Sequence, residues 1–220
     1  MNQMKFQIYI ALMSAVLFSS CIKGVQEKTD LPVLGGEEAL VTNEDGKPQI
    51  DTLYPDLASF EFMNQDSQIV TGEFYNGKIY VTDFFFTSCP TICPKMTKQM
   101  LRLYRAFETD DQVYFLSHSI DTRNDSVPKL KAYATKLEVE APKWNFVTGK
   151  MKHIQAMAEK YMVVAGEDDA APGGYMHSGH FVLIDGNHKI RGYYDGTVEQ
   201  DVDQLASDIE LLKELENAHR

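Results

Sequence analysis

Two cysteines, Cys89 and Cys93, lie four positions apart in TSCPTICPKM (residues 87–96), and a proline follows each of them. A disulfide between them would close a very small loop, and the stabilisation that a disulfide gives grows with the length of the loop. A bridge kept only for stability is therefore a poor explanation. A closely spaced pair of this kind suits either a redox couple or a metal site.

The spacing of the two cysteines does not decide between these chemistries. Thioredoxin-type oxidoreductases have two residues between their cysteines, whereas three residues (90–92) intervene here, giving a wider loop that can still close a disulfide. Two thiolates so placed can also hold a soft ion such as Cu(I). A third ligand, ideally an imidazole, would improve such a metal site.

The chain offers six histidines as the third ligand. We expect His118 to be a packed histidine at the end of a strand, while a helix surface, a turn and the chain end account for His153, His188 and His219. His177 and His180 remain, in a Gly-rich loop that runs into a strand and can arch over the cysteine loop. Met176 could add a soft thioether ligand.

The cysteines are placed by a strand and the helix that follows it. KIYVTDFFF (78–86) is a run of β-branched and aromatic residues, which predicts a buried strand. Apolar residues recur at helical spacing beyond Pro94, which is acceptable in a first helical turn. The cysteines therefore leave the carboxyl end of a central strand, where open α/β sheets hold their sites, and the helix N-terminus favours both thiolates.

The other elements predict a central mixed sheet with helices on both faces. Residues 60–70 resemble a small extra N-terminal hairpin, and two further strands are expected at 112–120 and 144–149. Helices are expected at 125–137, with a capping residue and Pro128 at its start, and around 154–161. Strands at 180–185 and 190–196 form a hairpin, and an amphipathic helix over 198–215 closes the chain.

The N-terminal twenty residues have the pattern of a signal peptide. A lysine near the start precedes an apolar run from Phe6 to Phe18, which is short for a membrane span, and LFSSC ends at Cys21. This resembles a bacterial lipoprotein signal, in which Cys21 would be acylated as the mature N-terminus. We expect a signal over 1–20, a membrane tether and irregular lead-in over 21–52, and a lipid-anchored, extracytoplasmic domain on the periplasmic side of a bacterial membrane.

The charge of the chain argues against a nucleic acid partner. Its 220 residues carry a formal net charge of −11, and the charged residues are interspersed along the sequence. No basic cluster stands out that would replace phosphate counterions. Most charges are expected to form a solvated surface.

Four segments together resemble the Sco/SenC family of membrane-anchored, thioredoxin-like copper proteins. They are GKIYVTDFFFTSCPTICPKM, SIDTRNDSVPKLKAYA, WNFVTG and HSGHFVLID, within a span of roughly residues 55 to 215. The resemblance implies an α/β thioredoxin-like fold, a copper-binding domain over 53–220, and one copper ion, Cu(I) or Cu(II), held by Cys89, Cys93 and His177. It also implies delivery of copper to the CuA centre of cytochrome c oxidase, or reduction of cysteines there.

The chain departs from the family pattern beside the histidine. An acidic residue often precedes the ligand histidine, but Met176 stands here, and the lost carboxylate can no longer orient the imidazole. Asp83 and Asp121 match acidic positions of the pattern. Asp83 lies in an otherwise apolar strand, where its charge could tune the thiols or where it could simply bond to a neighbouring loop.

Two functions from different classes fit these residues. The first is a copper metallochaperone that uses Cys89, Cys93 and His177. The second is a thiol-disulfide reductase, in which Cys89 and Cys93 form a redox couple that attacks cysteines of an oxidase subunit or another extracytoplasmic partner. A peroxidase is less favoured, because no arginine precedes Arg102 near the motif. Two sulfurs joined to each other cannot serve as thiolate ligands, so copper and the disulfide exclude one another.

Overall fold

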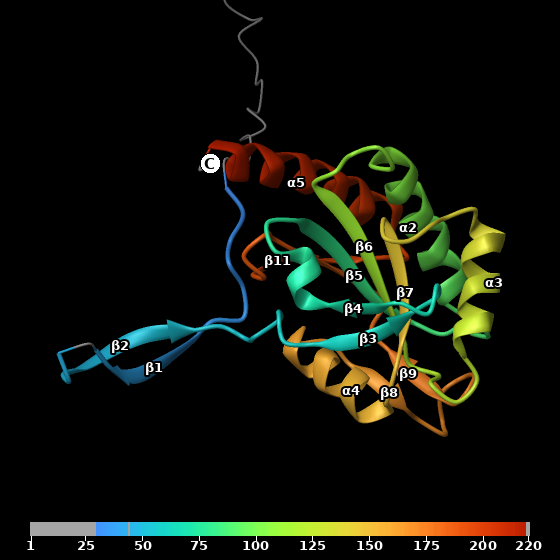
Figure 1. The fold of residues 1–220 in the computed structure, drawn as a ribbon, viewed down its shortest axis with the longest axis horizontal. Helices are drawn as coiled ribbons and strands as arrows, with labels where there is room; N and C mark the ends of the chain where they lie inside the picture. The colour runs from blue at the N-terminus through green and yellow to red at the C-terminus, as the bar shows by residue number, and fades with distance from the viewer. Residues whose placement is uncertain (1–29, 44, 219–220) are drawn as a thin grey trace, which may run out of the picture.

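A seven-stranded mixed sheet lies at the centre of the computed structural model, which describes residues 30–43 and 45–218 (Figure 1). Its three central strands run parallel and the outer pairs are antiparallel. In spatial order they are β11 (Ile190–Asp195), β10 (His180–Ile184), β5 (Ile79–Phe85), β6 (Val113–Ser119), β7 (Trp144–Thr148), β3 (Glu61–Asn64) and β4 (Ile69–Thr71). A short 3-10 helix, η1 (Gly72–Tyr75), leads into β5.

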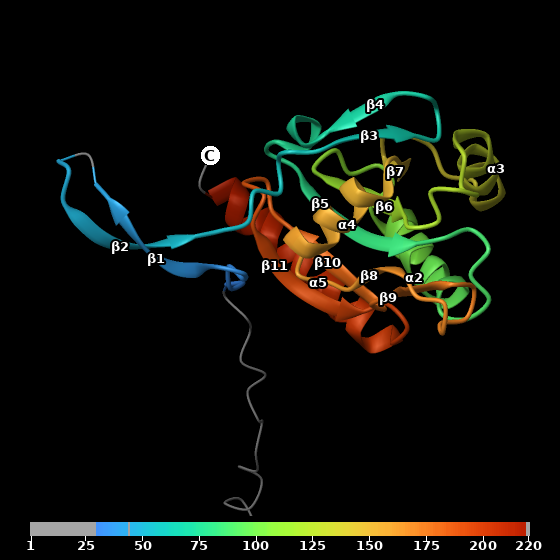
Figure 2. The same cartoon turned by 90° about the horizontal axis from the view of Figure 1, so that it is seen from below.

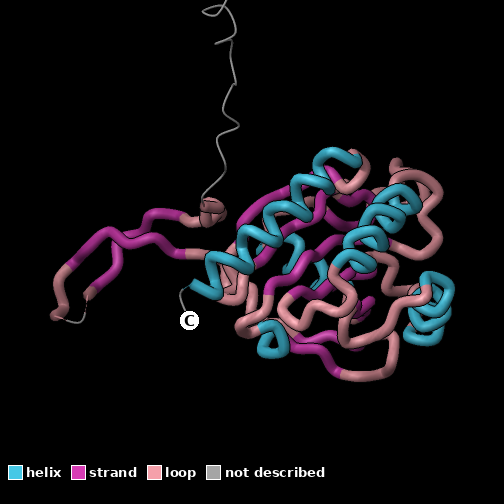
Figure 3. Tube along the Cα trace, turned by 90° about the horizontal axis from the view of Figure 1, so that it is seen from above, coloured by secondary structure: helices cyan, strands magenta, loops and turns pink. Residues whose placement is uncertain are grey.

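Helices cover both faces of this sheet, as the sequence predicts. On one face lie α2 (Cys93–Ala106), α3 (Val127–Leu137) and α5 (Glu199–Ala218), and Figure 3 shows α2 and α5 from their outer side. The opposite face carries α4 (Met151–Lys160), which Figure 2 shows in front of the sheet. Both parallel crossovers, β5 to β6 and β6 to β7, pass through the first face, so α2 and α3 lie side by side there.

The predicted central strand is confirmed, and all seven residues of β5 are buried. Its aromatic and β-branched side chains suit a strand that is covered on both faces. Alternation divides it: Asp83 and Phe85 face α2 and α3, whereas Thr82 and Phe84 face the opposite layer, where Phe84 stacks on His118. The chain leaves the carboxyl end of β5 and enters α2 after a short loop.

The N-terminal lead-in differs from the expected irregular segment. Residues 37–53 form an antiparallel hairpin of β1 (Glu37–Thr42) and β2 (Pro48–Leu53), which projects from the body of the molecule (Figures 1 and 2). Its turn is held by Asn43, whose side chain accepts a hydrogen bond from the backbone of Lys47 at 2.7 Å. The predicted hairpin at 60–70 is confirmed as β3 and β4, and β3 also pairs with β7, so this hairpin extends the main sheet.

Cys21 and the predicted signal lie outside the described residues, as does His219. Within the described part, none of the helices has the length and apolarity that a membrane span requires.

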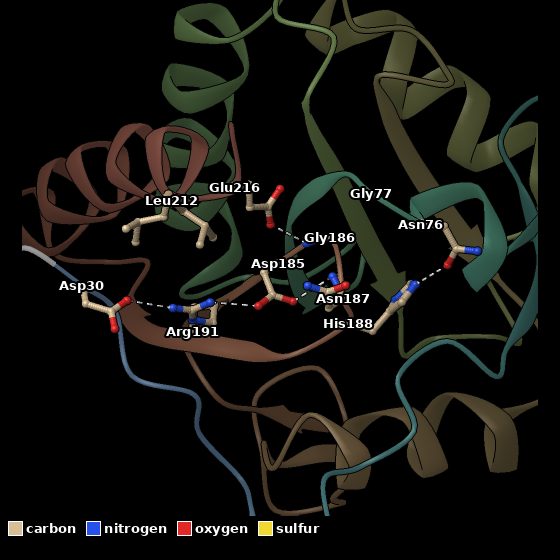
Figure 4. A pocket seen from close by; sticks show the side chains of 11 residues that line it. Asp30, Asn76, Gly77, Asp185, Gly186, Asn187, His188, Arg191, Leu212 and Glu216 are labelled. Carbon is tan, nitrogen blue, oxygen red and sulfur yellow. Dashed lines mark hydrogen bonds and ion pairs between the residues drawn. The ribbon is translucent and has the colours of Figure 1, made fainter. Parts of the chain in front are cut away.

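A cavity of about 930 Å³ lies at the end of the sheet opposite the cysteines, beside the residues that precede β5 (Figure 4). Arg191 crosses it and pairs with Asp185 at 2.9 Å and with Asp30 at 3.3 Å. The same guanidinium donates to the backbone carbonyls of Leu31 and Pro32. These contacts tie the segment around residue 31 to β11, so the described N-terminal chain enters the fold far from the cysteine loop.

Candidate metal centre

The cysteine loop connects the last residue of β5 to the first turn of α2. Cys89 is half-buried in this loop, and its backbone donates to the carbonyl of Phe86 at 3.2 Å. Cys93 is the first residue of α2 and is buried. The preceding Ile92 caps the helix without a side-chain hydrogen bond, and the backbone N–H groups of Lys95 and Met96 bond to its carbonyl at 3.0 and 3.1 Å. Pro94 has no N–H, so the backbone N–H of Cys93 is the first-turn donor that faces the Cys89 sulfur.

Asp125 fastens the start of this loop to the neighbouring strand and helix. Its buried carboxylate accepts hydrogen bonds from the backbone and hydroxyl of Thr87, at 2.9 and 2.6 Å, and from the hydroxyl of Ser119 at 2.7 Å. Lys129 pairs with the same carboxylate at 3.2 Å. Asp125 therefore bonds across to the cysteine loop. The predicted side-chain cap of this helix is not formed, because the N-cap of α3, Ser126, makes no side-chain cap hydrogen bond.

His177 reaches the cysteines from a separate two-stranded sheet. This sheet consists of β8 (Ala165–Glu167) and β9 (Tyr175–His177). β9 lies in the segment expected to be a Gly-rich loop, whereas β8 precedes that segment. The connection turns through Gly173 and Gly174, whose φ angles of 85° and 80° suit residues without a Cβ. The predicted arch over the cysteine loop is thus present, as a hairpin.

Tyr175 holds this hairpin in place. Its ring centroid lies 5.3 Å from that of Phe86, next to the cysteine loop, and its hydroxyl donates to Asp121 at 2.9 Å. Sequence reasoning did not single out Tyr175. Had the segment been recognised as a strand, alternation would have placed residues 175 and 177 on the same side.

The three predicted site residues meet at one point. The sulfurs of Cys89 and Cys93 and a ring nitrogen of His177 all lie within 4.8 Å of one another. His177 Nε2 is 3.1 Å from Cys93 Sγ, and Nδ1 is 3.2 Å from the carbonyl of Ser178. An Nδ1–H that donates to this carbonyl leaves the Nε2 lone pair directed at the sulfurs.

The expectation that the helix N-terminus favours both thiolates is wrong for Cys93, because the two thiols have different acidities. Partial burial opposes ionisation of Cys89, but hydrogen bonds from the Cys93 thiol and from Thr91 more than offset it and lower its pKa. Burial, together with the adjacent Cys89, raises the pKa of Cys93. Cys89 is therefore the thiol that ionises first.

His177 is held neutral, which is the form that binds metals. Burial lowers its pKa from the ordinary value, and the backbone carbonyl of Ser178 only partly opposes this. A neutral imidazole beside one thiolate and one thiol makes a soft S₂N donor set. The same two sulfurs can alternatively join as a disulfide.

The other candidate ligands lie outside this group. Met176 precedes His177 on β9, so its side chain leaves the strand on the opposite side, and it is 48 % exposed. His180 is exposed at the start of β10, where it pairs in register with Asp195. His118 is fully buried as expected, with Nδ1 3.1 Å from the Thr82 hydroxyl.

The two acidic residues of the family pattern have distinct surroundings. Asp83 lies within the core, where burial raises its pKa to about 7 although the Ser117 hydroxyl donates to it at 2.5 Å. Its partner is therefore on the adjacent strand β6, not in a loop. Asp121 accepts the Tyr175 hydroxyl and the side-chain amide of Asn124, so it supports the hairpin that carries His177.

Comparison with known proteins identifies the family of this chain. The SCO1/SenC family profile matches residues 53–214. A SCO1/SenC family lipoprotein from Bacillus anthracis is 31% identical, with a TM-score of 0.65 over 73% of this chain and 96% of that one. BsSco, described as a member of the Sco family of cytochrome c oxidase assembly proteins with a disulfide switch, is 29% identical, with a TM-score of 0.63 over 73% and 94%.

A copper-bound structure has the same fold. ScoI from Bradyrhizobium japonicum with copper bound superimposes with a TM-score of 0.56 over 66% of this chain and 94% of that one. At 22% identity this likeness concerns the fold alone. The fold is thioredoxin-like, and the family profile spans it from the end of β2 to the last helix, with the two cysteines and the histidine inside it. The chain therefore belongs to the SCO1/SenC family.

Proposed function

We propose that this protein binds one copper ion through Cys89, Cys93 and His177 and delivers it to the CuA site during assembly of cytochrome c oxidase. The observation that carries the proposal is the convergence of two sulfurs and one imidazole nitrogen within 4.8 Å. Thiolates and a neutral imidazole are donors that Cu(I) prefers. The soft donor set supports the choice of metal, and the oxidase-assembly family supports the choice of pathway.

The geometry also favours release of the metal to a partner. Cys89 is half-buried at the rim of the site, whereas Cys93 and His177 lie beneath it. An incoming thiolate can therefore replace Cys89 first, and the remaining ligands follow. Ligand exchange of this kind moves the ion without releasing it to solvent.

Copper titration of the reduced chain tests this function. The wild-type dithiol protein is expected to bind about one copper per chain, with sulfur-to-copper charge transfer on oxidation to Cu(II). His177→Ala and Cys93→Ser should weaken binding by at least about 100-fold, since each removes a ligand. His180→Ala, which alters an exposed neighbour, is the matched control and should bind normally. Equal uptake of copper by the disulfide form would contradict the proposal.

A second function, thiol-disulfide reduction, is favoured by the different acidities of the two thiols. The Cys89 thiolate would attack a partner's disulfide, forming a mixed disulfide and releasing one partner thiolate. Cys93 would then lose its proton and attack the Cys89 sulfur, forming the Cys89–Cys93 disulfide and freeing the second partner thiol. Reduction of a peptide disulfide by His177→Ala at the wild-type rate would separate this activity from copper binding.

Acylation of Cys21 would place this domain outside the cytoplasm, at the surface of a bacterial membrane. The LFSSC sequence supports it, together with the lipoprotein relative from Bacillus anthracis. Incorporation of labelled palmitate into the wild-type chain, and its loss in Cys21→Ser, is the expected result. Incorporation of palmitate into the Cys21→Ser chain would contradict acylation at Cys21.

A further inference from the structure

A groove runs from the cysteines between α2 and α3. It has a volume of about 340 Å³, with Cys89 and Cys93 at one end and Leu101, Tyr133 and Leu137 among its apolar lining. The two helices are joined inside it by a hydrogen bond of 2.9 Å between the Thr97 and Tyr133 hydroxyls. The groove is therefore a fixed, partly apolar surface that begins at the thiol with the lower pKa.

The helices that form the groove are strongly basic, although the sequence suggested interspersed charges. They carry seven basic residues and no acidic one, in a chain with 21 basic and 32 acidic residues. The basic residues are Lys95, Lys98, Arg102, Arg105, Lys129, Lys131 and Lys136. In contrast, α5 on the same face of the sheet carries seven acidic residues and one lysine.

Three of the seven basic residues form no ion pair within the part of the chain that the structure describes. Two of these three line the groove, and the third, Lys95, is exposed at the start of α2. Arg102, Arg105, Lys129 and Lys131 pair with carboxylates. Lys98 and Lys136 line the groove, are exposed, and form no ion pair with any residue in the described ranges. Two unneutralised cations thus flank an apolar surface that ends at Cys89.

We propose that this groove docks an acidic segment of the partner protein, in an orientation that brings a partner cysteine to Cys89. The inference rests on the proposed function, because it concerns a partner that exchanges thiols or copper with this site. An extended segment with an apolar side chain and flanking Asp or Glu residues matches the groove in charge and polarity. Such complementarity speeds encounter and selects the partner.

Thiol exchange with charged peptides tests the groove without copper. Two synthetic peptides carry one cysteine as a mixed disulfide with 5-thio-2-nitrobenzoate, flanked by glutamates in one and by lysines in the other. The Cys89 thiolate attacks the peptide sulfur, a Cys89–peptide disulfide forms, and the nitrobenzoate thiolate leaves with the electron pair of the broken bond. Its absorbance gives the rate for the reduced full-length chain.

At low salt the acidic peptide should react roughly 5- to 20-fold faster than the basic peptide, and high salt should remove most of this preference. Lys98→Glu combined with Lys136→Glu should abolish or reverse the preference. Lys152→Glu, an exposed lysine on α4 across the sheet, is the control and should keep it. Iodoacetamide is neutral, so its rate of reaction with Cys89 reports the reactivity of the thiol without a charge preference. Each peptide rate is divided by the iodoacetamide rate of the same variant, which corrects for any change in the reactivity of Cys89.

Equal rates for the two peptides, or a preference that survives the double substitution, would contradict the proposal that the groove docks an acidic segment. Copper titration remains the separate test of the metal function. Normal copper binding without a peptide preference would contradict the docking proposal alone. A peptide preference without copper binding would support the docking proposal and contradict the proposed metal function. Self-association that the double substitution abolishes would identify a second copy of this chain as the occupant and overturn the proposed partner.

Discussion

Asp83 is a carboxyl group buried in the face of the sheet that α2 and α3 cover. Its hydroxyl partner Ser117 also accepts a hydrogen bond from the Trp144 indole at 2.9 Å, so the group belongs to a buried polar chain. Burial raises its pKa from 3.8 to about 7. Asp83 therefore binds its proton more tightly in the native state than in the unfolded state. The stability that this tighter proton binding contributes is fully present below about pH 4 and is lost as pH rises to about 7.

Asp83→Asn should consequently stabilise the protein more at pH 8 than at pH 5. Each pKa unit corresponds to about 1.4 kcal/mol, and after relaxation of the site we expect a gain of about 1–3 kcal/mol at pH 8. Urea unfolding at both pH values measures the difference. Equal effects at the two pH values would show that Asp83 ionises in the folded protein as it does in the unfolded chain.

The unequal thiols predict a selective reaction. Cys89 is half-buried and has the lower pKa, whereas Cys93 is buried and its pKa is raised. Because the thiolate is the nucleophile, iodoacetamide should alkylate Cys89 at least about 10-fold faster than Cys93 at pH 8. Peptide mapping by mass spectrometry distinguishes the two sites and Cys21. Preferential labelling of Cys93 would contradict the assignment of Cys89 as the attacking thiol.

At the scale of elements, the β8–β9 hairpin decides where the imidazole lies. Gly173 packs against Phe86, and a Cβ at this position would come within 2.9 Å of the Phe86 ring. A Cβ at Gly174 would meet nothing within 4 Å, although both glycines have positive φ. The pair therefore separates a steric effect on the hairpin from the backbone strain that any side chain causes at such an angle.

Gly173→Ala should weaken copper binding by about 10-fold or more, because the hairpin must move away from the cysteine loop to relieve the contact with Phe86. Gly174→Ala carries a similar strain without the contact, and we expect a loss of less than about 3-fold. Copper titration of the two reduced variants gives the comparison. Equal losses in both would mean that the position of His177 does not depend on packing against Phe86.

The elements also show which parts of this fold follow from sequence patterns. The buried strand over 79–85 and the helix beyond Cys93 are confirmed, because burial on both faces and helical periodicity leave clear signals. The β1–β2 hairpin was missed because β2 is exposed throughout and has no apolar face. His177 could be preferred over His180 only through the family resemblance, since its approach depends on two short strands and the turn at Gly173 and Gly174.

At the scale of the whole molecule, the sheet separates two ends with different tasks. The thiols and the basic groove lie beyond the carboxyl end of β5, while the described N-terminal chain is fastened at the opposite end by Arg191. A chain tethered through its N-terminus would thus hold the thiols directed away from the point of attachment. The acidic α5 and the basic α2 and α3 further divide one face by charge.

This separation predicts that the N-terminal fastening can be weakened without changing the metal site. Arg191→Met removes a guanidinium that is 12% exposed and leaves Asp185, which is 4% exposed, without its ion pair. Because backbone N–H groups still bond to Asp185, we expect a loss of about 2–3 kcal/mol in unfolding free energy. Lys131→Met, which removes a more exposed ion pair with Asp66, should cost less than about 1 kcal/mol. Copper affinity of the folded Arg191→Met protein should equal that of the wild type, and a parallel loss of affinity would show that the two ends are coupled through the sheet.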